Sequence, residues 1–392
     1  MDFPGKRFVN YIKHDVVPDE KEIIVRVLIT GITSFLGLYT AKLLLREGHE
    51  VIGAVRPGSR RASELDAYGI TAYPTYRTVH LDLSELPAPE LGEAHYAQVM
   101  GSISPLLDAW VHFAWDGVGS AGRSDTNIQI ENVQNAKKAY LYAKLLGARK
   151  FLFAGSQAEY GTGNHRVPMP VSPYGKAKLA FGRWATEQSL LSELYDDTPM
   201  QFIHMRIYSV YGKGDHETSL VNTVLKAALH HEAITLGPCT QRWNYLEVHD
   251  LARAIRILLV SEDTRTDVYD IAGSDSRALK KYVIAMNSIA GKFAAVNNIA
   301  LSGASVSSAA FETSTESDRP HASSSSDGAP ASATAATSFG ADLQFGTRAN
   351  NAEGAADMSP EILKLQRIGF HQEISFEAGI GMLLKEMCRS HA

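Results

Sequence analysis

A tyrosine and a lysine stand at a spacing that could move a proton to or from a substrate hydroxyl. Tyr174 and Lys178 lie one turn apart on a predicted helix that opens with Ser172 and Pro173, so both fall on one face. A tyrosine with its ordinary pKa of about 10 is a poor base at neutral pH, but a nearby ammonium lowers that pKa by roughly 1–3 units. Tyr174 is therefore a candidate acid/base tuned by Lys178, although the same pattern fits an ordinary amphipathic helix.

A serine upstream makes the catalytic interpretation more specific. Ser156 follows a predicted strand at 150–154 and precedes Tyr174 by 18 residues. At the carboxyl end of a strand, its hydroxyl can orient a reacting oxygen towards Tyr174. A serine in such a loop can also be a simple turn residue.

Glycines follow the first predicted strand, 23–30, in the stretch TGITSFLG. Gly31 permits a tight turn, Gly37 permits close helix–sheet packing, and the helix N-terminus offers N–H groups to a pyrophosphate. Ser34 replaces the usual middle glycine, and its hydroxyl could cap the helix or bind a phosphate oxygen. The loop predicts dinucleotide binding through Gly31, Thr33, Ser34, Phe35, Leu36 and Gly37.

The end of the second predicted strand, 50–55, usually discriminates between the two nicotinamide dinucleotides. An acidic residue there binds the NAD ribose, whereas an arginine accepts the NADP 2′-phosphate. Here Arg56 comes first, followed by Arg60 and Arg61. We therefore favour NADP over NAD, with a solvated loop as the alternative. After the third strand, Asp82 and the adjacent Leu83 suit an adenine-edge contact, although Asp82 could equally cap a helix.

Strand-length apolar runs alternate with helical stretches in the first half of the chain. Strands are predicted at 23–30, 50–55, 110–114, 150–154 and 201–207, and helices at 34–47, 125–146 and 174–194. Such alternation is typical of a parallel sheet covered by helices. The sequence predicts an α/β fold, a Rossmann-type doubly wound parallel sheet that binds ligands at the carboxyl ends of its strands.

The later elements are shorter and more mixed. Helices are predicted near 218–231, 249–260, 277–291 and 375–388, with a strand at 268–271. We interpret 1–22 as a polar leader and 23–212 as the NAD(P)-binding domain, to whose sheet later segments return. Residues 213–294 and 342–392 then form a smaller C-terminal substrate lobe. Residues 295–341 are mostly Ser, Ala, Thr and Gly and cannot offset their ordering entropy, so they are predicted to be a disordered insertion.

The composition excludes several classes of protein and of binding partner for this chain. The 392 residues carry 38 basic and 43 acidic side chains, which does not favour a nucleic-acid partner. Two cysteines and scattered histidines predict no disulfide scaffold and no metal site. No apolar run approaches the roughly 18 residues of a membrane span, and the start does not resemble a secretory signal. We expect a cytoplasmic protein without a membrane partner.

Taken together, the motifs resemble those of the extended short-chain dehydrogenase/reductase family, the NAD(P)-dependent nucleotide-sugar epimerases and dehydratases. The similarity covers TGITSFLG, HFAW, GSQAEYG, PYGKAK, RIYSVYG, RWNYLEVHD, YDIAG and ISFEAGI. It implies Ser156, Tyr174 and Lys178 as the catalytic set, with Lys178 also holding the nicotinamide ribose. It further implies cofactor contacts from Phe113, Ala114 and Trp115, a lobe that binds a nucleoside-diphosphate sugar, and a homodimer through the helices at 125–146 and 174–194.

Departures from the family pattern narrow the range of reactions expected of this chain. Dehydratases carry an Asp-Glu pair where this chain has Gln157 and Ala158, and Glu159 falls one residue late, so dehydration is not expected. A substrate-binding Asn is replaced by Ser209, and the diphosphate Arg falls on Trp243. Arg242, Arg206 or Arg123 could serve instead, unless they form ordinary surface ion pairs. The candidate substrate contacts are thus Arg123, Ser156, Gln157, Ser209, Arg242 and Trp243.

The sequence therefore predicts an epimerase or 4-ketoreductase that transfers a hydride at a sugar carbon, C4. In this chemistry Tyr174 is the acid/base, Lys178 lowers its pKa and Ser156 orients the reacting oxygen. The alternative is a non-catalytic dinucleotide sensor or RNA-associated scaffold on the same fold. The intact Ser156, Tyr174 and Lys178 argue against it, because a sensor needs none of them.

Overall fold

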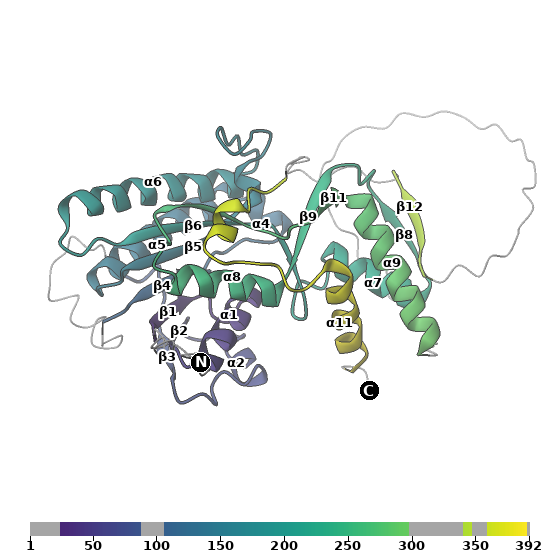
Figure 1. The fold of residues 1–392 in the computed structure, drawn as a ribbon, viewed down its shortest axis with the longest axis horizontal. Coiled ribbons are helices and arrows are strands. Elements are labelled where there is room, and N and C mark those ends of the chain that lie inside the picture. Colours follow the sequence, from purple (N-terminus) through teal and green to yellow (C-terminus); the bar gives the residue numbers. More distant parts are fainter. Residues whose placement is uncertain (1–23, 88–105, 298–339, 347–358, 390–392) are drawn as a thin grey trace, which may run out of the picture.

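The computed structural model describes residues 24–87, 106–297, 340–346 and 359–389 (Figure 1). The predicted leader, 1–22, and most of the predicted insertion lie outside these residues. The described edges of that insertion belong to ordered elements. Helix α9 (Leu279–Val296) continues past the predicted start at 295, and Ala341 exchanges two hydrogen bonds with the side chain of Asn287.

A seven-stranded sheet forms the centre of the larger unit, in the order β10-β6-β5-β4-β1-β2-β3, with every neighbouring pair parallel. Residues of its central strands are almost fully buried, as expected for a sheet that is covered on both faces. This confirms the predicted Rossmann-type fold. The strands are β1 Arg26–Thr30, β2 Glu50–Val55, β3 Tyr76–His80, β4 Ala109–His112, β5 Lys150–Ser156, β6 Gln201–Ile207 and β10 Asp267–Ile271.

Two pairs of helices cover the two faces of this sheet (Figure 1). Helices α1 (Phe35–Arg46) and α8 (Val248–Val260) share one apolar core with the sheet. Helices α5 (Thr126–Leu145) and α6 (Pro173–Tyr195) share the core on the other side. Both β10 and α8 come from the range 213–294, so part of the chain beyond 212 lies with the large sheet.

The remaining elements form a smaller unit beside the sheet (Figure 1). A three-stranded sheet, β11-β9-β7, and a two-stranded sheet, β12-β8, accompany α7, α9 and α11 around a separate apolar core. The bounds are β7 Ser209–Tyr211, β8 Ala233–Leu236, β9 Arg242–Glu247, β11 Ser276–Ala278, β12 Asp342–Phe345, α7 Leu220–His230 and α11 Phe376–Arg389. Short helices complete the fold: α2 Glu64–Ala67, α4 Ser120–Ser124 and α10 Leu363–Arg367.

Two negative findings apply to the described residues. None of their helices combines the length and apolar character that crossing a bilayer requires. Their His, Cys, Asp and Glu side chains also form no group suited to hold a metal ion.

Candidate active site

The turn between β1 and α1 is built as a close-packed cradle. Gly31 has φ +73°, and a Cβ added there would lie 2.7 Å from the backbone nitrogen of Ala114. A Cβ added to Gly37 would lie 2.4 Å from the carbonyl oxygen of Gly31. Both positions therefore require glycine, and the turn rests directly on the chain that follows β4.

Ser34 caps helix α1. Its hydroxyl accepts a hydrogen bond of 3.1 Å from the Gly37 N–H, so of the two roles foreseen for this serine the structure shows capping. Thr33 precedes the cap, while Phe35 and Leu36 form the first residues of α1. A glycine cradle closed by a helix N-terminus fits the pyrophosphate of a dinucleotide, because its N–H groups and positive helix end face the same place.

The ends of β2 and β3 carry the residues predicted to contact the adenosine half of a cofactor. Arg56 pairs with Asp116 at 3.2 Å, and both side chains are more than half exposed. Asp82 accepts hydrogen bonds from the backbone and hydroxyl of Ser84, and the hydroxyl bond lowers the pKa of its carboxyl group. Asp82 therefore stabilises the turn after β3, and Leu83 beside it is buried.

The chain after β4 is held by side chains of α5. The Asn132 amide bonds both the N–H and the carbonyl of Asp116, at 2.9 and 2.8 Å. Gln129 accepts a 2.8 Å hydrogen bond from the Trp115 indole. Phe113, Ala114 and Trp115 are thus fixed between the glycine turn and the catalytic candidates on α6.

Lys178 is buried at the carboxyl end of β5. Its Nζ donates to the Ala154 carbonyl at 2.6 Å and lies 3.8 Å from the ring centroid of Trp115. The same atom is 5.6 Å from the ring centroid of Tyr174, so the predicted pair does share one face of α6. Burial holds the pKa of Lys178 well below its usual value, and the carboxylate of Glu159 opposes that shift only in part.

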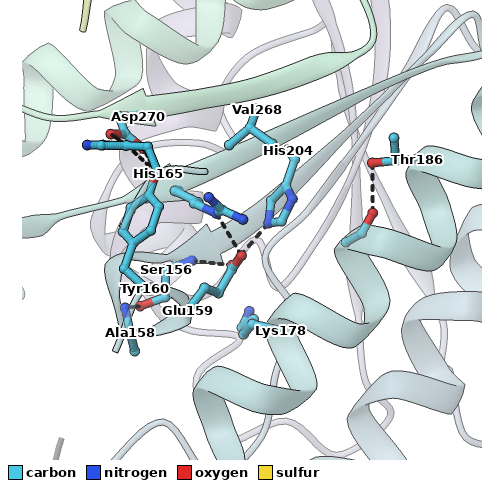
Figure 2. Close-up of polar contacts among 12 residues, drawn as sticks. Ser156, Ala158, Glu159, Tyr160, His165, Lys178, Thr186, His204, Val268 and Asp270 are labelled. Atoms are coloured by element: carbon cyan, nitrogen blue, oxygen red, sulfur yellow. Dashed lines mark hydrogen bonds and ion pairs between the residues drawn. The ribbon is translucent and has the colours of Figure 1, made fainter. Parts of the chain in front are cut away.

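Ser156 and Tyr174 are both largely buried near this lysine. Ser156 ends β5, and its hydroxyl accepts a 3.2 Å hydrogen bond from Ala158 N–H (Figure 2). Arg123, on the short helix α4, places its guanidinium carbon 4.6 Å from the ring centroid of Tyr174. The structure thus gathers Ser156, Tyr174, Lys178 and Arg123 beside the chain that supports the glycine turn.

A buried ion cluster behind this site was not foreseen from the sequence. Glu159 has no exposed surface; its carboxylate accepts from Ser156 N–H at 2.8 Å, lies 3.0 Å from His204 Nε2 and pairs with Arg206 Nε at 2.9 Å (Figure 2). Arg206 is therefore committed to Glu159, and the sequence-based suggestion that it binds a substrate phosphate is not supported. A cavity of about 410 Å³ borders His204 and Arg206 but not the catalytic candidates.

The other predicted substrate residues lie on three elements. Gln157 begins a single 3₁₀ turn directly after Ser156. Ser209 is on β7, where it pairs with Tyr245 of β9, the strand that also carries Arg242 and Trp243. Arg242 donates to the Ser276 carbonyl at 2.6 Å, and Trp243 packs on the core of the smaller unit.

Comparison with known proteins gives curated relatives and solved structures of similar fold. A CDP-abequose synthase of Yersinia pseudotuberculosis is 23% identical over 71% of this chain and 87% of its own length. A UDP-glucose 4-epimerase of Corynebacterium glutamicum is 24% identical over 68% of this chain and 80% of its own length.

Among solved structures, the UDP-glucose 4-epimerase of Thermus thermophilus in complex with NAD aligns with a TM-score of 0.64 at 17% identity, covering 93% of this chain and 99% of that one. A UDP-N-acetylglucosamine 4-epimerase from Methanobrevibacter ruminantium aligns with a TM-score of 0.65 at 15% identity, covering 94% and 99%. Finally, the model of the NAD dependent epimerase/dehydratase family matches residues 27–272. The chain therefore belongs to the NAD dependent epimerase/dehydratase family.

Proposed function

We propose that this protein is an NAD(P)-dependent nucleotide-sugar epimerase or 4-ketoreductase that acts at C4 of the sugar. The observation that carries the proposal is the position of Lys178, whose buried amine lies between the end of β5, Trp115 and the ring of Tyr174. The glycine cradle of β1 and α1 adjoins the same chain after β4. The family match and the site both support this chemistry. The site combines a phenol, an amine and a glycine turn that fits a dinucleotide.

In the proposed mechanism Tyr174 exchanges a proton with the C4 oxygen of the sugar. The ammonium of Lys178 favours the phenolate, which takes the proton from the C4 hydroxyl; in the reverse direction the phenol returns it to the ketone. Ser156 holds the reacting oxygen towards Tyr174, and its own backbone is fixed by Glu159. The nicotinamide cofactor, when bound, accepts or delivers the hydride at the same carbon.

Elimination of water is not part of this proposal. It requires a carboxyl group directed at the sugar, and the two residues after Ser156 are Gln157 and Ala158. Glu159, the nearest acid in sequence, points into the protein and binds His204 and Arg206. The environment of Glu159 therefore favours epimerisation or ketone reduction over dehydration.

NADP is the proposed cofactor in preference to NAD. Arg56 extends from the end of β2, and its guanidinium is exposed apart from the pair with Asp116. This place normally holds an acid in NAD enzymes and a cation in NADP enzymes. Arg56 would bind the 2′-phosphate by exchanging Asp116 for it.

A nucleoside-diphosphate sugar is the proposed substrate, bound between the large sheet and the smaller unit. The curated relatives are named for a CDP-sugar and a UDP-sugar, so the nucleotide class has support from both. Arg123, Gln157, Ser209, Arg242 and Trp243 are the proposed contacts. We further propose that the protein is cytoplasmic and works as a homodimer through α5 and α6.

Absorbance at 340 nm tests the proposal and separates its two forms. Purified protein is incubated with CDP- and UDP-hexoses and, separately, with their 4-keto derivatives plus NADPH. Stoichiometric loss of NADPH with a 4-keto sugar identifies a reductase, whereas interconversion of hexoses without net absorbance change identifies an epimerase. Absence of both, in protein that binds the cofactor, contradicts the proposed function.

A further inference from the structure

Glu159 is a buried carboxylate to which the proposed proton transfer assigns no role. It closes the 3₁₀ turn Gln157–Glu159 and forms a reciprocal cap with Ser156, in which each residue binds the other end of the turn. The cap fixes the backbone from which the Ser156 hydroxyl extends. Any change in the carboxylate therefore acts first on the position of Ser156.

The backbone around Glu159 and His204 leaves space that larger residues would fill. A Cβ added to Gly155 would lie 2.5 Å from Glu159 Oε1, and one added to Gly182 would lie 2.2 Å from His204 Cε1. Two glycines, on β5 and α6, thus make space for one buried pair. Because His204 and Arg206 both come from β6, the cluster also joins the end of β5 to its neighbouring strand.

The cluster also keeps its carboxylate charged. Burial alone raises the pKa of Glu159, but His204, Arg206 and the Ser156 N–H together hold that pKa below its usual value. A buried carboxylate with two such partners remains an anion at neutral pH. The negative charge therefore persists in the interior beside the catalytic candidates.

The amine of Lys178 is the group on which the negative charge of Glu159 acts. Figure 2 shows Lys178 rising from α6 towards Glu159, and its Nζ binds the carbonyl of Ala154, two residues before Ser156 on the same strand. The charged or titratable groups around the amine are Glu159 from the turn after β5, Arg123 from α4, Tyr174 from α6 and His112 from β4. Burial, and to a smaller degree Lys178, lower the pKa of His112 to about 3, so that ring is neutral.

We propose that Glu159 is a positioning residue of the active site: it fixes Ser156 through the backbone and presents a negative charge to the Lys178 amine. Burial and Arg123 both disfavour the ammonium, whereas Glu159 favours it. The role rests on the proposed function, in which a charged Lys178 assists Tyr174. It differs from the roles of Ser156 and Tyr174 because Glu159 acts only through other residues.

The test is a direct titration of Lys178 by ¹³C NMR in protein labelled at lysine Cε, with the signal assigned from its loss in Lys178→Ala. Glu159→Gln keeps an oxygen for the Ser156 N–H but removes the negative charge. Its Lys178 midpoint is expected to fall by about 1 pH unit or more, and the alkaline limb of kcat to move down equally. A merely structural role would lower thermal stability without moving either midpoint.

A second variant answers the risk that Glu159→Gln does not fold, because it leaves Arg206 buried without its counter-charge. Glu159→Gln with Arg206→Gln removes both charges together and is expected to lower the Lys178 midpoint by less than Glu159→Gln alone, because loss of the Arg206 cation offsets part of the loss of the carboxylate. Asp270→Asn is the matched control. Asp270 is also buried and accepts from Tyr160, so its loss should reduce stability and leave the Lys178 midpoint unchanged.

Two results would overturn the proposal. One is a Lys178 midpoint that matches the unsubstituted protein in folded Glu159→Gln, or in the double variant where the single variant does not fold. The other needs no variant: a Lys178 that is already neutral at pH 7 in the unsubstituted protein has no ammonium on which the charge of Glu159 could act. Because NMR requires no substrate, these results are distinguishable from failure of the proposed function, which is absence of turnover with every nucleotide sugar.

Discussion

In the proposed mechanism the ammonium of Lys178 places a positive charge in a buried site. Its amine is held by the carbonyl of Ala154 and the ring of Trp115, neither of which carries a full charge. A cation held this way remains electrostatically effective at nearby groups, because its field is not cancelled by a direct counter-ion. The pKa of the nearby Tyr174 phenol is the property that this charge would lower.

Replacing this amine should therefore change the pH dependence of catalysis. Lys178→Met is expected to lower kcat/KM by about 10²–10⁴-fold. Without the ammonium the Tyr174 pKa rises, so the acid limb of the profile should move up by roughly 1–3 pH units. Lys176→Met, at an exposed position of the same helix, is the control and should behave as the unsubstituted enzyme. A Lys178→Met profile that superimposes on the original would show that the amine does not tune Tyr174.

Arg56 is the residue that we propose to decide cofactor preference. Arg56→Ala should weaken NADPH binding by about 10- to 100-fold, because a charged hydrogen-bonding group contributes about 1.5–3 kcal/mol. NADH, which lacks the 2′-phosphate, serves as the internal control and should bind unchanged. Fluorescence titration with both cofactors measures the ratio. Equal weakening of the two would mean that Arg56 supports the loop and does not select the phosphate.

The placement of the candidate residues was predictable from the sequence where the partners are close along the chain. Tyr174 and Lys178 are one helical turn apart, and Ser156 follows a recognisable strand. The role of Glu159 was missed because its partners, His204 and Arg206, stand 45 and 47 residues away. The local sign was an acid that falls one residue after the positions of the dehydratases' Asp-Glu pair.

At the scale of elements, the turn from β1 to α1 depends on backbone room and conformation together. Gly31 has a positive φ and would place a Cβ 2.7 Å from Ala114 N, so Gly31→Ala combines strain with a steric clash. We expect a loss of at least about 1–2 kcal/mol in stability and a marked loss of dinucleotide affinity. Thermal unfolding and cofactor titration measure the two effects.

Gly69 provides the matched control for this prediction. It has nearly the same φ, +69°, but nothing lies within 4 Å of an added Cβ. Gly69→Ala should therefore show the conformational cost alone, of about 1 kcal/mol, with cofactor binding retained. If Gly31→Ala binds the cofactor as well as Gly69→Ala does, the cradle is not the dinucleotide site.

The elements themselves were predictable in proportion to their length and burial. Long apolar runs gave β1, β2, β5 and β6, and α8 and α11 follow their predicted ranges closely. The short strands β7 and β11, of three residues each, are only half-buried and carry no periodic signal. Strand β12 pairs with β8 across more than 100 residues of sequence, which no local pattern can indicate.

At the scale of the whole molecule, one end of α6 presents apolar side chains to solvent. Leu190, Leu194 and Tyr195 are 49, 73 and 80% exposed. Together with α5, this helix forms the surface through which we propose dimerisation. Exposed apolar groups gathered on one helix are typical of such an interface.

Assembly is tested by charging this surface. Leu194→Asp should shift the protein from dimer to monomer in sedimentation velocity, because it places a charge in the apolar contact. Leu363→Asp, at a similarly exposed position on α10, should leave the dimer intact. An unchanged dimer in Leu194→Asp would exclude the end of α6 from the interface.

We propose that Tyr174 moves the proton while the rest of the fold binds the cofactor. Tyr174→Phe removes one oxygen atom and keeps the ring beneath Arg123. The measurement is turnover of the identified nucleotide sugar, followed at 340 nm or by sugar analysis, alongside the Kd for the cofactor. We predict at least a 10²-fold loss of kcat, on the order expected for a lost acid/base, with the Kd changed by less than about 2-fold. Turnover close to that of the unsubstituted enzyme would show that Tyr174 is not the acid/base.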